Sequence, residues 1–251
     1  MSKFFSPIRQ QLGILRSIVM YYWKPFNKKR LMEFYEPFVK EEALCFDIGA
    51  HLGNRTNAWN ALGAKVVAVE PQPQCMQFLK RKFGQSKNVV LLQQAVGAKA
   101  GRATFHVSEL TPTISTMATK DWQQAIADKT SFKVSWDQQL KVKVVTLDQL
   151  IATYGTPDFC KIDVEDFEVE VLKGLSAALP VLSFEYFTPT LFRIFECMDL
   201  LDALGKYEYN WSFGESQVFN SETWLSTSEM RKIFDSYTID DRSGDVYARL
   251  L

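Results

Sequence analysis

The chain has 251 residues, of which 47% are hydrophobic and 23% are charged. This composition is typical of globular proteins and excludes intrinsic disorder, and the length suits one α/β domain or such a domain with an added arm. The 29 basic and 29 acidic residues cancel. The chain therefore has no net field that attracts nucleic acid, and we expect no nucleic-acid partner.

The cysteines and the apolar runs bear on where the protein resides. No two cysteines have a CxxC or zinc-knuckle spacing, so we expect reduced thiols and a cytoplasmic protein. No uncharged apolar run reaches the roughly 18 residues of a membrane span. Arg16 also interrupts the one stretch that resembles a signal peptide. The cysteines are Cys45, Cys75, Cys160 and Cys197.

Residues 1–40 predict a basic, amphipathic helical arm in front of a main domain over residues 41–251. Seven basic residues and no acidic one occur between Met1 and Met32. Such a helix can lie on an anionic membrane surface, or it can pack on the main domain with its basic face in water. We favour the second arrangement and keep peripheral membrane contact as the alternative. The apolar residues at helical spacing are Leu12, Leu15, Ile18, Val19 and Tyr22.

From residue 43 onward, apolar strands alternate with helices, which predicts a mostly parallel sheet covered on both faces. A polar stretch at 108–140, between short strands at 103–107 and 142–145, reads as an insertion. A closing antiparallel pair is expected from 207–213 and 246–250, around a helix near 227–234. The remaining predicted strands are 43–48, 65–70, 88–93, 158–162 and 181–186, and the helices are 56–62, 74–83, 167–178 and 190–204.

A glycine turn closes the first strand, in the sequence DIGAHLG that runs from Asp47 to Gly53. Gly49 lets the chain turn sharply, and Gly53 is expected to let the backbone approach a ligand. Glu70 follows at the end of the next strand, where a carboxylate can accept hydrogen bonds from the ribose hydroxyls of an adenosine cofactor. The two features together predict a nucleotide-type site.

Asp47 indicates which cofactor this site takes. It occupies the first glycine position of the dinucleotide-binding pattern G-x-G-x-x-G. A carboxylate there would repel a pyrophosphate but attract the ammonium and sulfonium groups of S-adenosylmethionine. Asp47 therefore favours a methyl donor over a nicotinamide dinucleotide.

Acidic residues also follow the next two strands of the sheet. Asp163 and Glu165 close the strand at 158–162, and Glu185 lies in the strand at 181–186. These carboxylates are expected at the same crevice, where one can hold the donor or take a proton from an acceptor hydroxyl. They are our candidate catalytic residues. A divalent cation among the three is an alternative that we do not favour, because no further ligand cluster accompanies them.

The ordered segments CFDIGAHLGNRT, VVAVEPQPQ, QQAVG, VVTLDQL, FCKIDVEDFEVEVLKG and VLSFEY resemble the FkbM family of methyltransferases. The resemblance covers residues 45–186. It implies a Rossmann-like α/β fold with a seven-stranded, mostly parallel sheet, an antiparallel closing strand and helices on both faces. It also implies S-adenosylmethionine as donor and O-methylation, often of a sugar hydroxyl on a glycoside, glycolipid or polyketide. The acceptor is then a small molecule, and its specificity should reside in 108–140 and after Tyr186.

Position by position, the resemblance assigns roles to the donor-site residues. It implies that Glu70 binds the ribose and that Asp163 and Glu165 form the acidic pair. The donor loop would hold Asp47, Gly49, Ala50 and Gly53; Pro71 and Gln72 would follow Glu70; and Gln94 and Ala95 would lie beside the adenine.

The chain departs from the family pattern at two positions. Asp166 stands where the family usually has glycine, which puts the acceptor or the activity in question. His51 stands where asparagine is common. A histidine in the donor loop can act as a general base, but we favour a hydrogen bond that shapes the loop.

Two other functions remain as alternatives. One is a non-catalytic or membrane-associated family member that acts as a binding scaffold, which Asp166 and the basic arm suggest. The other is a nicotinamide-dependent oxidoreductase, against which Asp47 and the Asp163–Glu165 pair both speak.

Overall fold

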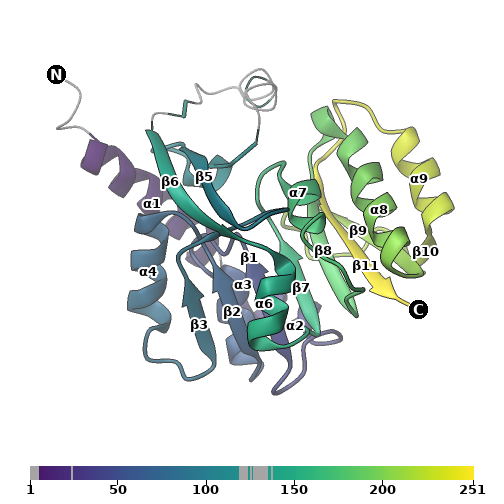
Figure 1. Ribbon diagram of the computed structural model, residues 1–251, viewed down its shortest axis with the longest axis horizontal. Coiled ribbons are helices and arrows are strands. Elements are labelled where there is room, and N and C mark those ends of the chain that lie inside the picture. Colours follow the sequence, from purple (N-terminus) through teal and green to yellow (C-terminus); the bar gives the residue numbers. More distant parts are fainter. Residues whose placement is uncertain (1–5, 24, 119–123, 125, 127–134, 137) are drawn as a thin grey trace.

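A computed structural model describes residues 6–23, 25–118, 124, 126, 135–136 and 138–251. Its main sheet has eight strands in the order β10-β9-β11-β8-β7-β1-β2-β3 (Figure 1). The strands are β1 (Leu44–Ile48), β2 (Lys65–Val69), β3 (Val89–Leu92), β7 (Phe159–Ile162), β8 (Val181–Tyr186), β9 (Tyr207–Phe213), β10 (Leu225–Ser226) and β11 (Gly244–Leu250).

The strand directions confirm the α/β fold class. Strands β3, β2, β1, β7 and β8 pair in parallel, while β11 lies antiparallel between β8 and β9. The pairing of β9 with β11, with a helix between them in the chain, is the predicted closing arrangement. The sheet has one strand more than the seven expected, because the two-residue β10 adds itself to the edge of β9.

Helices cover both faces of the main sheet, and each face has its own core. Alternate residues of β1 divide between them: Cys45 packs with one face and Phe46 with the other. The first face carries α2 (Asn27–Tyr35), α3 (Asn54–Ala61) and α4 (Pro73–Phe83); the second carries α6 (Leu147–Tyr154), α7 (Glu168–Leu172), α8 (Phe192–Leu204) and α9 (Thr227–Asp235).

Helix α7 is shorter than the predicted helix at 167–178. The helix ends where Gly174 comes against the carbonyl of Gly97, at a spacing that leaves no room for a side chain. The carbonyl of Gly174 then accepts a hydrogen bond from the Asp148 amide at the start of α6. Contacts distant in sequence thus stop a helix that the apolar pattern would have continued.

A second sheet of three strands lies beside the first, in the order β4-β6-β5 (Figure 1). Much of the predicted insertion between β5 and β6 lies outside the described residues. Its beginning, at 108–118, includes the short 3₁₀ helix η1. The elements are β4 (Ala95–Val96), β5 (Gly101–Val107), β6 (Gln138–Val145) and η1 (Pro112–Ile114).

The N-terminal segment forms two helices, α1 (Ser6–Tyr22) and α2. Helix α2 packs into the core through Leu31 and Tyr35, and the Tyr35 ring lies edge-on to Trp59 of α3. The division into an arm and a main domain stays a prediction, and residues 1–5 and 24 lie outside the described part. No helix in the described ranges is long and apolar enough to cross a membrane. All four cysteines are buried free thiols.

Candidate functional site

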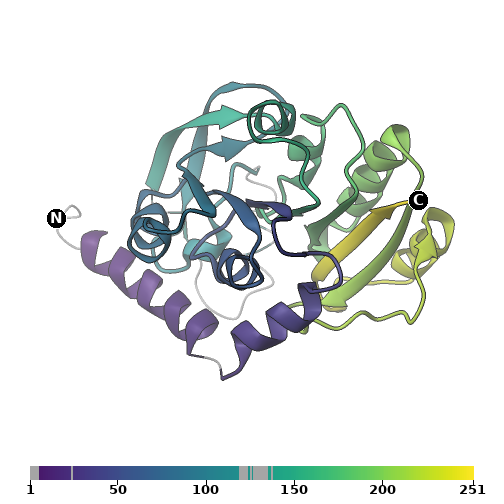
Figure 2. The same cartoon turned by 90° about the horizontal axis from the view of Figure 1, so that it is seen from below.

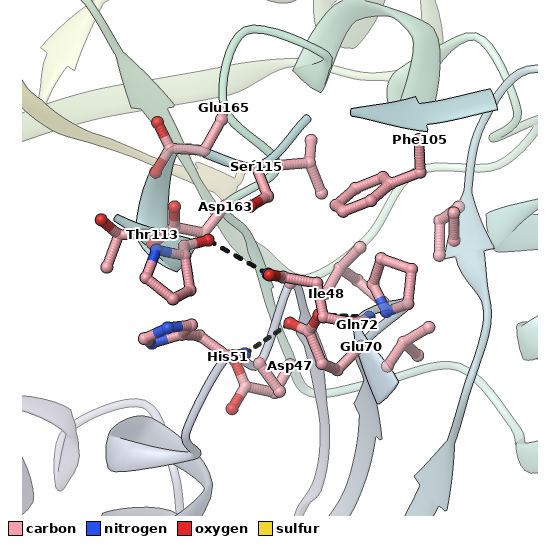
Figure 3. Close-up of a pocket in the computed structure, with 18 of the residues that line it drawn as sticks. Asp47, Ile48, His51, Glu70, Gln72, Phe105, Thr113, Ser115, Asp163 and Glu165 are labelled. Carbon is pink, nitrogen blue, oxygen red and sulfur yellow. Dashed lines mark hydrogen bonds between the residues drawn. The ribbon is translucent and has the colours of Figure 1, made fainter. Parts of the chain in front are cut away.

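A cavity that is open to solvent lies at the carboxyl ends of β1, β2 and β7 (Figure 3). The loops after these strands form its floor, and β4, β5 and the segment 112–117 form its opposite wall. This is the edge of a parallel sheet where ligands bind in open α/β folds.

The glycine turn of the donor loop is tightly packed. Gly49 has φ +84°, and a Cβ atom there would lie 1.8 Å from the carbonyl oxygen of Asp163. Gly53, with φ +74°, does not line the cavity. A Cβ atom at this position would meet Leu79 and Phe83 of α4 instead. The sequence led us to expect that the backbone at Gly53 approaches a ligand closely. In the structure, Gly53 packs closely against the protein's own core instead.

Asp47 lines the cavity and also holds the start of α3. Its Oδ2 accepts hydrogen bonds from the backbone amide of Thr56 at 3.1 Å and from the Thr56 hydroxyl at 2.5 Å. Burial raises the pKa of Asp47 in spite of these bonds. The acid thus has a structural partner, which the sequence reasoning did not foresee, in addition to its place on the cavity wall.

Glu70 is a buried carboxylate held by two backbone amides. Its Oε2 accepts from the amide of His51 at 2.9 Å, and its Oε1 accepts from the amide of Gln72 at 2.7 Å. Burial outweighs these bonds and raises the pKa of Glu70 to about 7. A carboxylate in this position gains from any further hydroxyl donor that enters the cavity.

His51 shapes the loop through its backbone rather than through its ring. Its φ is +49°, a left-handed conformation that asparagine also tolerates. Its ring lines the cavity, and burial lowers the pKa of the imidazole to about 4. The side chain is therefore neutral near pH 7 and a weak base, which argues against general-base catalysis by His51.

The remaining residues assigned by resemblance also lie on the cavity wall. Pro71 and Gln72 follow Glu70, while Gln94 and Ala95 stand where β3 gives way to β4, near Phe105 of β5. Among the residues assigned to donor binding, Gly53 is the one that the described cavity lining does not include.

The segment after β5 spans the cavity from one side to the other. Gln72 donates from Nε2 to the carbonyl of Pro112 at 3.1 Å. Farther along, the Thr116 hydroxyl donates to the carbonyl of Glu165 at 2.6 Å. This wall, lined by Pro112, Thr113, Ser115 and Met117, belongs to the predicted insertion, but no motif had singled out these residues.

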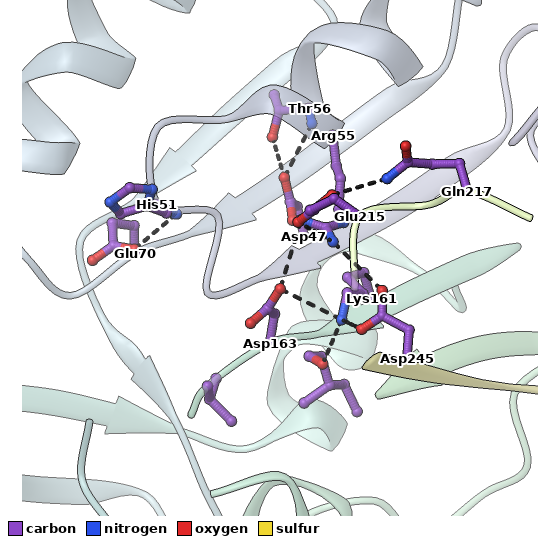
Figure 4. Close-up of polar contacts among 12 residues, drawn as sticks. Asp47, His51, Arg55, Thr56, Glu70, Lys161, Asp163, Glu215, Gln217 and Asp245 are labelled. Carbon is purple, nitrogen blue, oxygen red and sulfur yellow. Dashed lines mark hydrogen bonds and ion pairs between the residues drawn. The ribbon is translucent and has the colours of Figure 1, made fainter. Parts of the chain in front are cut away.

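Asp163 sits beside a buried network of charges (Figure 4). Lys161, fully buried in β7, lies 2.7 Å from Asp245 of β11 and 3.5 Å from Asp163. Arg55 of α3 lies 3.6 Å from Asp163 and also contacts Glu215 and Asp245. Burial alone would raise the pKa of Asp163, but the two cations lower it below its ordinary value. Asp163 is therefore ionised.

Glu165 and Glu185 are close to Asp163 but differ in their access to the cavity. The three carboxyl groups have oxygen atoms within 4.8 Å of one another. Glu165 lines the cavity, whereas Glu185 lies behind it, in a smaller pocket beside α8. Burial raises the pKa of both groups, and neighbouring carboxylates raise it further. Glu185 is not among the described residues that line the larger cavity, and its catalytic role stays a prediction.

The same three acids have the spacing of a cation site. Acidic side chains at this distance can share protons or bind a cation, and spacing alone does not decide between the two. Burial and the neighbouring carboxylates raise the pKa of Glu165 and Glu185, and a bound cation would act in the opposite direction. We assign no metal here.

The backbone conformation at Asp166 explains why glycine suits this position. Both Glu165 and Asp166 have positive φ, +58° and +69°, and glycine adopts this conformation at no steric cost. The side chain of Asp166 turns away from the cavity. It accepts from the Thr190 hydroxyl at 2.7 Å and pairs with Arg193 at 2.8 Å. Asp166 therefore does not obstruct the cavity that Glu165 lines.

Sequence reasoning missed the basic partners of the acids. Arg55 and Lys161 are both buried, and neither was a candidate. Lys161 did carry a signal, because a lysine inside an apolar strand needs a buried acid as partner. Asp245, 84 residues away, had no recognisable motif.

The sheet order and the cavity at the carboxyl ends of its strands define a Rossmann-like α/β protein with a nucleotide-type site. Residues 47–239, about three quarters of the chain, match the methyltransferase FkbM domain, and the chain belongs to this family. The resemblance noted from the sequence is confirmed. Membership of a methyltransferase family speaks against the nicotinamide-dependent alternative.

Individual relatives are more distant. The hexuronic acid methyltransferase AglP of Haloferax volcanii is 26% identical over 148 residues, which cover 58% of this chain and 55% of that protein. The match thus spans about half the length of this curated relative. Precorrin-6y C5,15-methyltransferase of Geobacter metallireducens aligns over 92% of this chain and 90% of its own, with 12% identity and a TM-score of 0.47. An O-methyltransferase of Bacillus cereus in complex with SAH aligns over 100% and 92%, with 12% identity and a TM-score of 0.44.

Proposed function

We propose that the protein transfers a methyl group from S-adenosylmethionine to a hydroxyl group of a sugar. One observation carries the donor assignment to this cavity. Among the described residues that line it, four are acidic and Arg55 alone is basic, and Arg55 is already paired with acids. A cationic ligand stabilises the ionised form of buried acids, so a lining rich in carboxyl groups suits such a ligand. The acidic residues are Asp47, Glu70, Asp163 and Glu165.

The residues at the donor end fit the parts of the cofactor. The buried carboxylate of Glu70 has a pKa of about 7, and ribose hydroxyls would supply the donors that stabilise its charge. Asp47 and Asp163 also line the cavity and would face the cationic methionine part. Ala95 and Phe105 offer apolar surface to an adenine ring.

The chemistry at the acceptor end requires one proton acceptor. S-adenosylmethionine supplies an activated methyl group, so the protein has to align the acceptor oxygen with it and exclude water. As the new O–CH₃ bond forms and the S–CH₃ bond breaks, the hydroxyl proton passes to a carboxylate. Glu165 is the proposed acceptor because it lines the cavity and its pKa is raised. Glu185, which lies behind it, tunes the charge of Glu165 rather than touching the acceptor.

The charge of the cavity also bears on the acceptor. A sugar acceptor follows the family resemblance and the hexuronic acid methyltransferase AglP. A uronic acid brings its own carboxylate, and Arg55, the one described basic residue on the wall, is already neutralised by acids. The lining therefore favours a neutral sugar ring for this chain.

Calorimetry tests the donor site. Replacing Glu70 by Ala should abolish S-adenosylmethionine binding, while Glu70→Gln should weaken it and retain the fold. Glu222→Ala, at an exposed position far from the cavity, serves as the control and should bind normally. Donor affinity that survives in both Glu70 variants would overturn the placement. Asp47→Ala should also abolish binding, but it removes the Thr56 contacts as well.

Methyl transfer tests the acceptor class. With labelled donor, neutral hexosides should be methylated faster than the corresponding hexuronides. Faster methylation of the hexuronides would show that residues other than those described on the wall bind the acid. No transfer to either class, with donor binding intact, would refute the sugar acceptor.

A further inference from the structure

Helix α1 is fixed to the rest of the molecule through small residues on its inner face. Gly13 and Ser17 are buried, and a Cβ atom at Gly13 would lie 2.3 Å from the carbonyl oxygen of Glu109. At the end of the helix, the Tyr22 hydroxyl donates to the carbonyl of Leu52 at 2.7 Å. The Tyr22 ring lies 5.8 Å from that of Phe78 in α4. The helix therefore has a defined inner face and a defined outer face.

The outer face is apolar and uncovered in the described structure. Three large apolar side chains of α1, at a spacing of three and four residues, and two more just after the helix are between 43% and 77% exposed. They represent five of the twelve exposed large apolar residues in the described part of the chain. Figure 2 shows α1 and α2 along the outer edge of the molecule. We call these residues the outer stripe: Leu12, Leu15, Val19, Trp23 and Phe26.

Exposed basic side chains lie on α1, near the start of α2 and at the end of α4, which contacts α1. Lys28 is the second residue of α2, and Lys82 lies in the last turn of α4 with its Nζ 3.7 Å from the ring centroid of Tyr22. Partial burial and the charge of Lys28 lower the pKa of Lys82, so the two ammonium groups share one surface. Lys29 is paired with Glu33 at 3.6 Å. We call the exposed side chains of Arg16, Lys28, Lys80, Arg81 and Lys82 the basic rim.

The charge distribution favours one kind of partner. Residues 1–32 contain seven basic residues and no acidic one, although the whole chain has no net charge. A second copy of the chain meeting the outer stripe face to face would bring two basic rims together, and like charges repel. An anionic surface with an apolar interior satisfies the rim and the stripe at once.

We propose that the outer stripe and the basic rim dock this protein on the surface of a phospholipid bilayer that contains anionic lipids. The apolar side chains enter the boundary between headgroups and acyl chains, while the basic side chains contact lipid phosphates. The docking does not depend on the proposed methyl transfer. Where both hold, the acceptor sugar is one carried on a lipid, because η1 touches α1 and also lines the cavity.

Vesicle sedimentation of the full chain tests the docking. The protein should bind vesicles of phosphatidylcholine and phosphatidylglycerol, bind pure phosphatidylcholine weakly, and dissociate as salt is raised. Leu15→Ser combined with Val19→Ser should reduce binding about tenfold or more. Lys28→Glu combined with Lys82→Glu should reduce binding to anionic vesicles and have little effect on neutral ones.

A matched control and two other measurements make the test decisive. Phe192→Ser combined with Ile239→Ser removes two similarly exposed apolar side chains that lie outside the N-terminal helices and should bind vesicles as the wild type does. Donor binding by calorimetry should be unchanged in all three variants, which separates docking from methyl transfer. The proposal fails if the Leu15/Val19 variant binds vesicles normally. It also fails if sedimentation velocity shows a dimer that this variant converts to a monomer.

Discussion

Glu70 and Asp163 line the same cavity, one after β2 and the other after β7, and their carboxylates are held by different kinds of partner. Glu70 receives two neutral backbone amides and has its pKa raised to about 7. Asp163 lies near the charged groups of Lys161 and Arg55 and has its pKa lowered. Desolvation acts to raise the pKa of both acids, so the comparison shows that hydrogen bonds alone do not offset desolvation here, whereas full opposite charges do.

The difference implies that the ion pairs around Asp163 contribute more to the stability of the fold than the hydrogen bonds of Glu70 do. Lys161→Met keeps the volume of the side chain but removes one of the two buried cations that contact Asp245 and Asp163, which leaves Arg55 as the other. We expect a loss of about 3–5 kcal/mol in the free energy of unfolding, measured by urea denaturation. Lys173→Met, which removes an exposed partner of Glu170, should cost less than about 1 kcal/mol. Equal losses would contradict the comparison.

The next effect concerns turnover. Glu165→Gln should lower kcat by about a hundredfold or more through loss of the proton acceptor, with donor affinity unchanged. In the wild type the ionised form of Glu165 accepts the proton. Since its pKa is raised, kcat should rise as pH rises through that pKa and be lost as pH falls below it. A flat profile of kcat against pH, or an unchanged kcat in Glu165→Gln, would remove Glu165 from this role.

A substitution at Glu168 tests the dependence of kcat on pH more closely. The charge of Glu168 helps to raise the pKa of Glu165, and Glu168→Gln can still accept the hydrogen bond from the amide of Val164. The rising limb of kcat should therefore move to lower pH in this variant. Glu170→Gln, at a more exposed position paired with Lys173, should leave the limb where it is.

The smallest expected effect is at Asp166. Both Asp166→Gly and Asp166→Ala remove the contacts with Thr190 and Arg193, but only glycine is free of strain at φ +69°. The alanine variant should be less stable than the glycine variant by about 1 kcal/mol, measured by thermal unfolding. If alanine proves as stable as glycine, the backbone conformation does not account for the family's preference.

The donor side was the more predictable side from sequence. Asp47, Gly49 and Glu70 reach the cavity because each ends or follows a strand, and parallel neighbouring strands end at one edge. The strand ranges from 43 to 93 and the closing pair were also readable, since apolar runs mark buried strands. These features depend on residues close together in the chain.

The partners of Asp163 were not predictable, because they depend on how distant strands pair in the sheet. No local sequence pattern specifies this pairing. Lys161 meets Asp245 because β7, β8 and β11 are adjacent in the sheet, and Arg55 meets Glu215 across 160 residues. The same reason explains why Glu185, at the end of a predicted strand, lies behind the cavity rather than on its wall. Gly53 carried a turn signal, but its neighbours in α4 were not readable from the sequence.

The packing at Gly49 limits how this enzyme can change over evolutionary time. With the carbonyl of Asp163 where a Cβ atom would be, and with a left-handed backbone, position 49 is closed to every side chain in any descendant that keeps the fold. The next two positions, Ala50 and His51, have side chains that already reach the cavity. Within the loop, we therefore expect substitutions at these two positions, while the contact between the ends of β1 and β7 is retained.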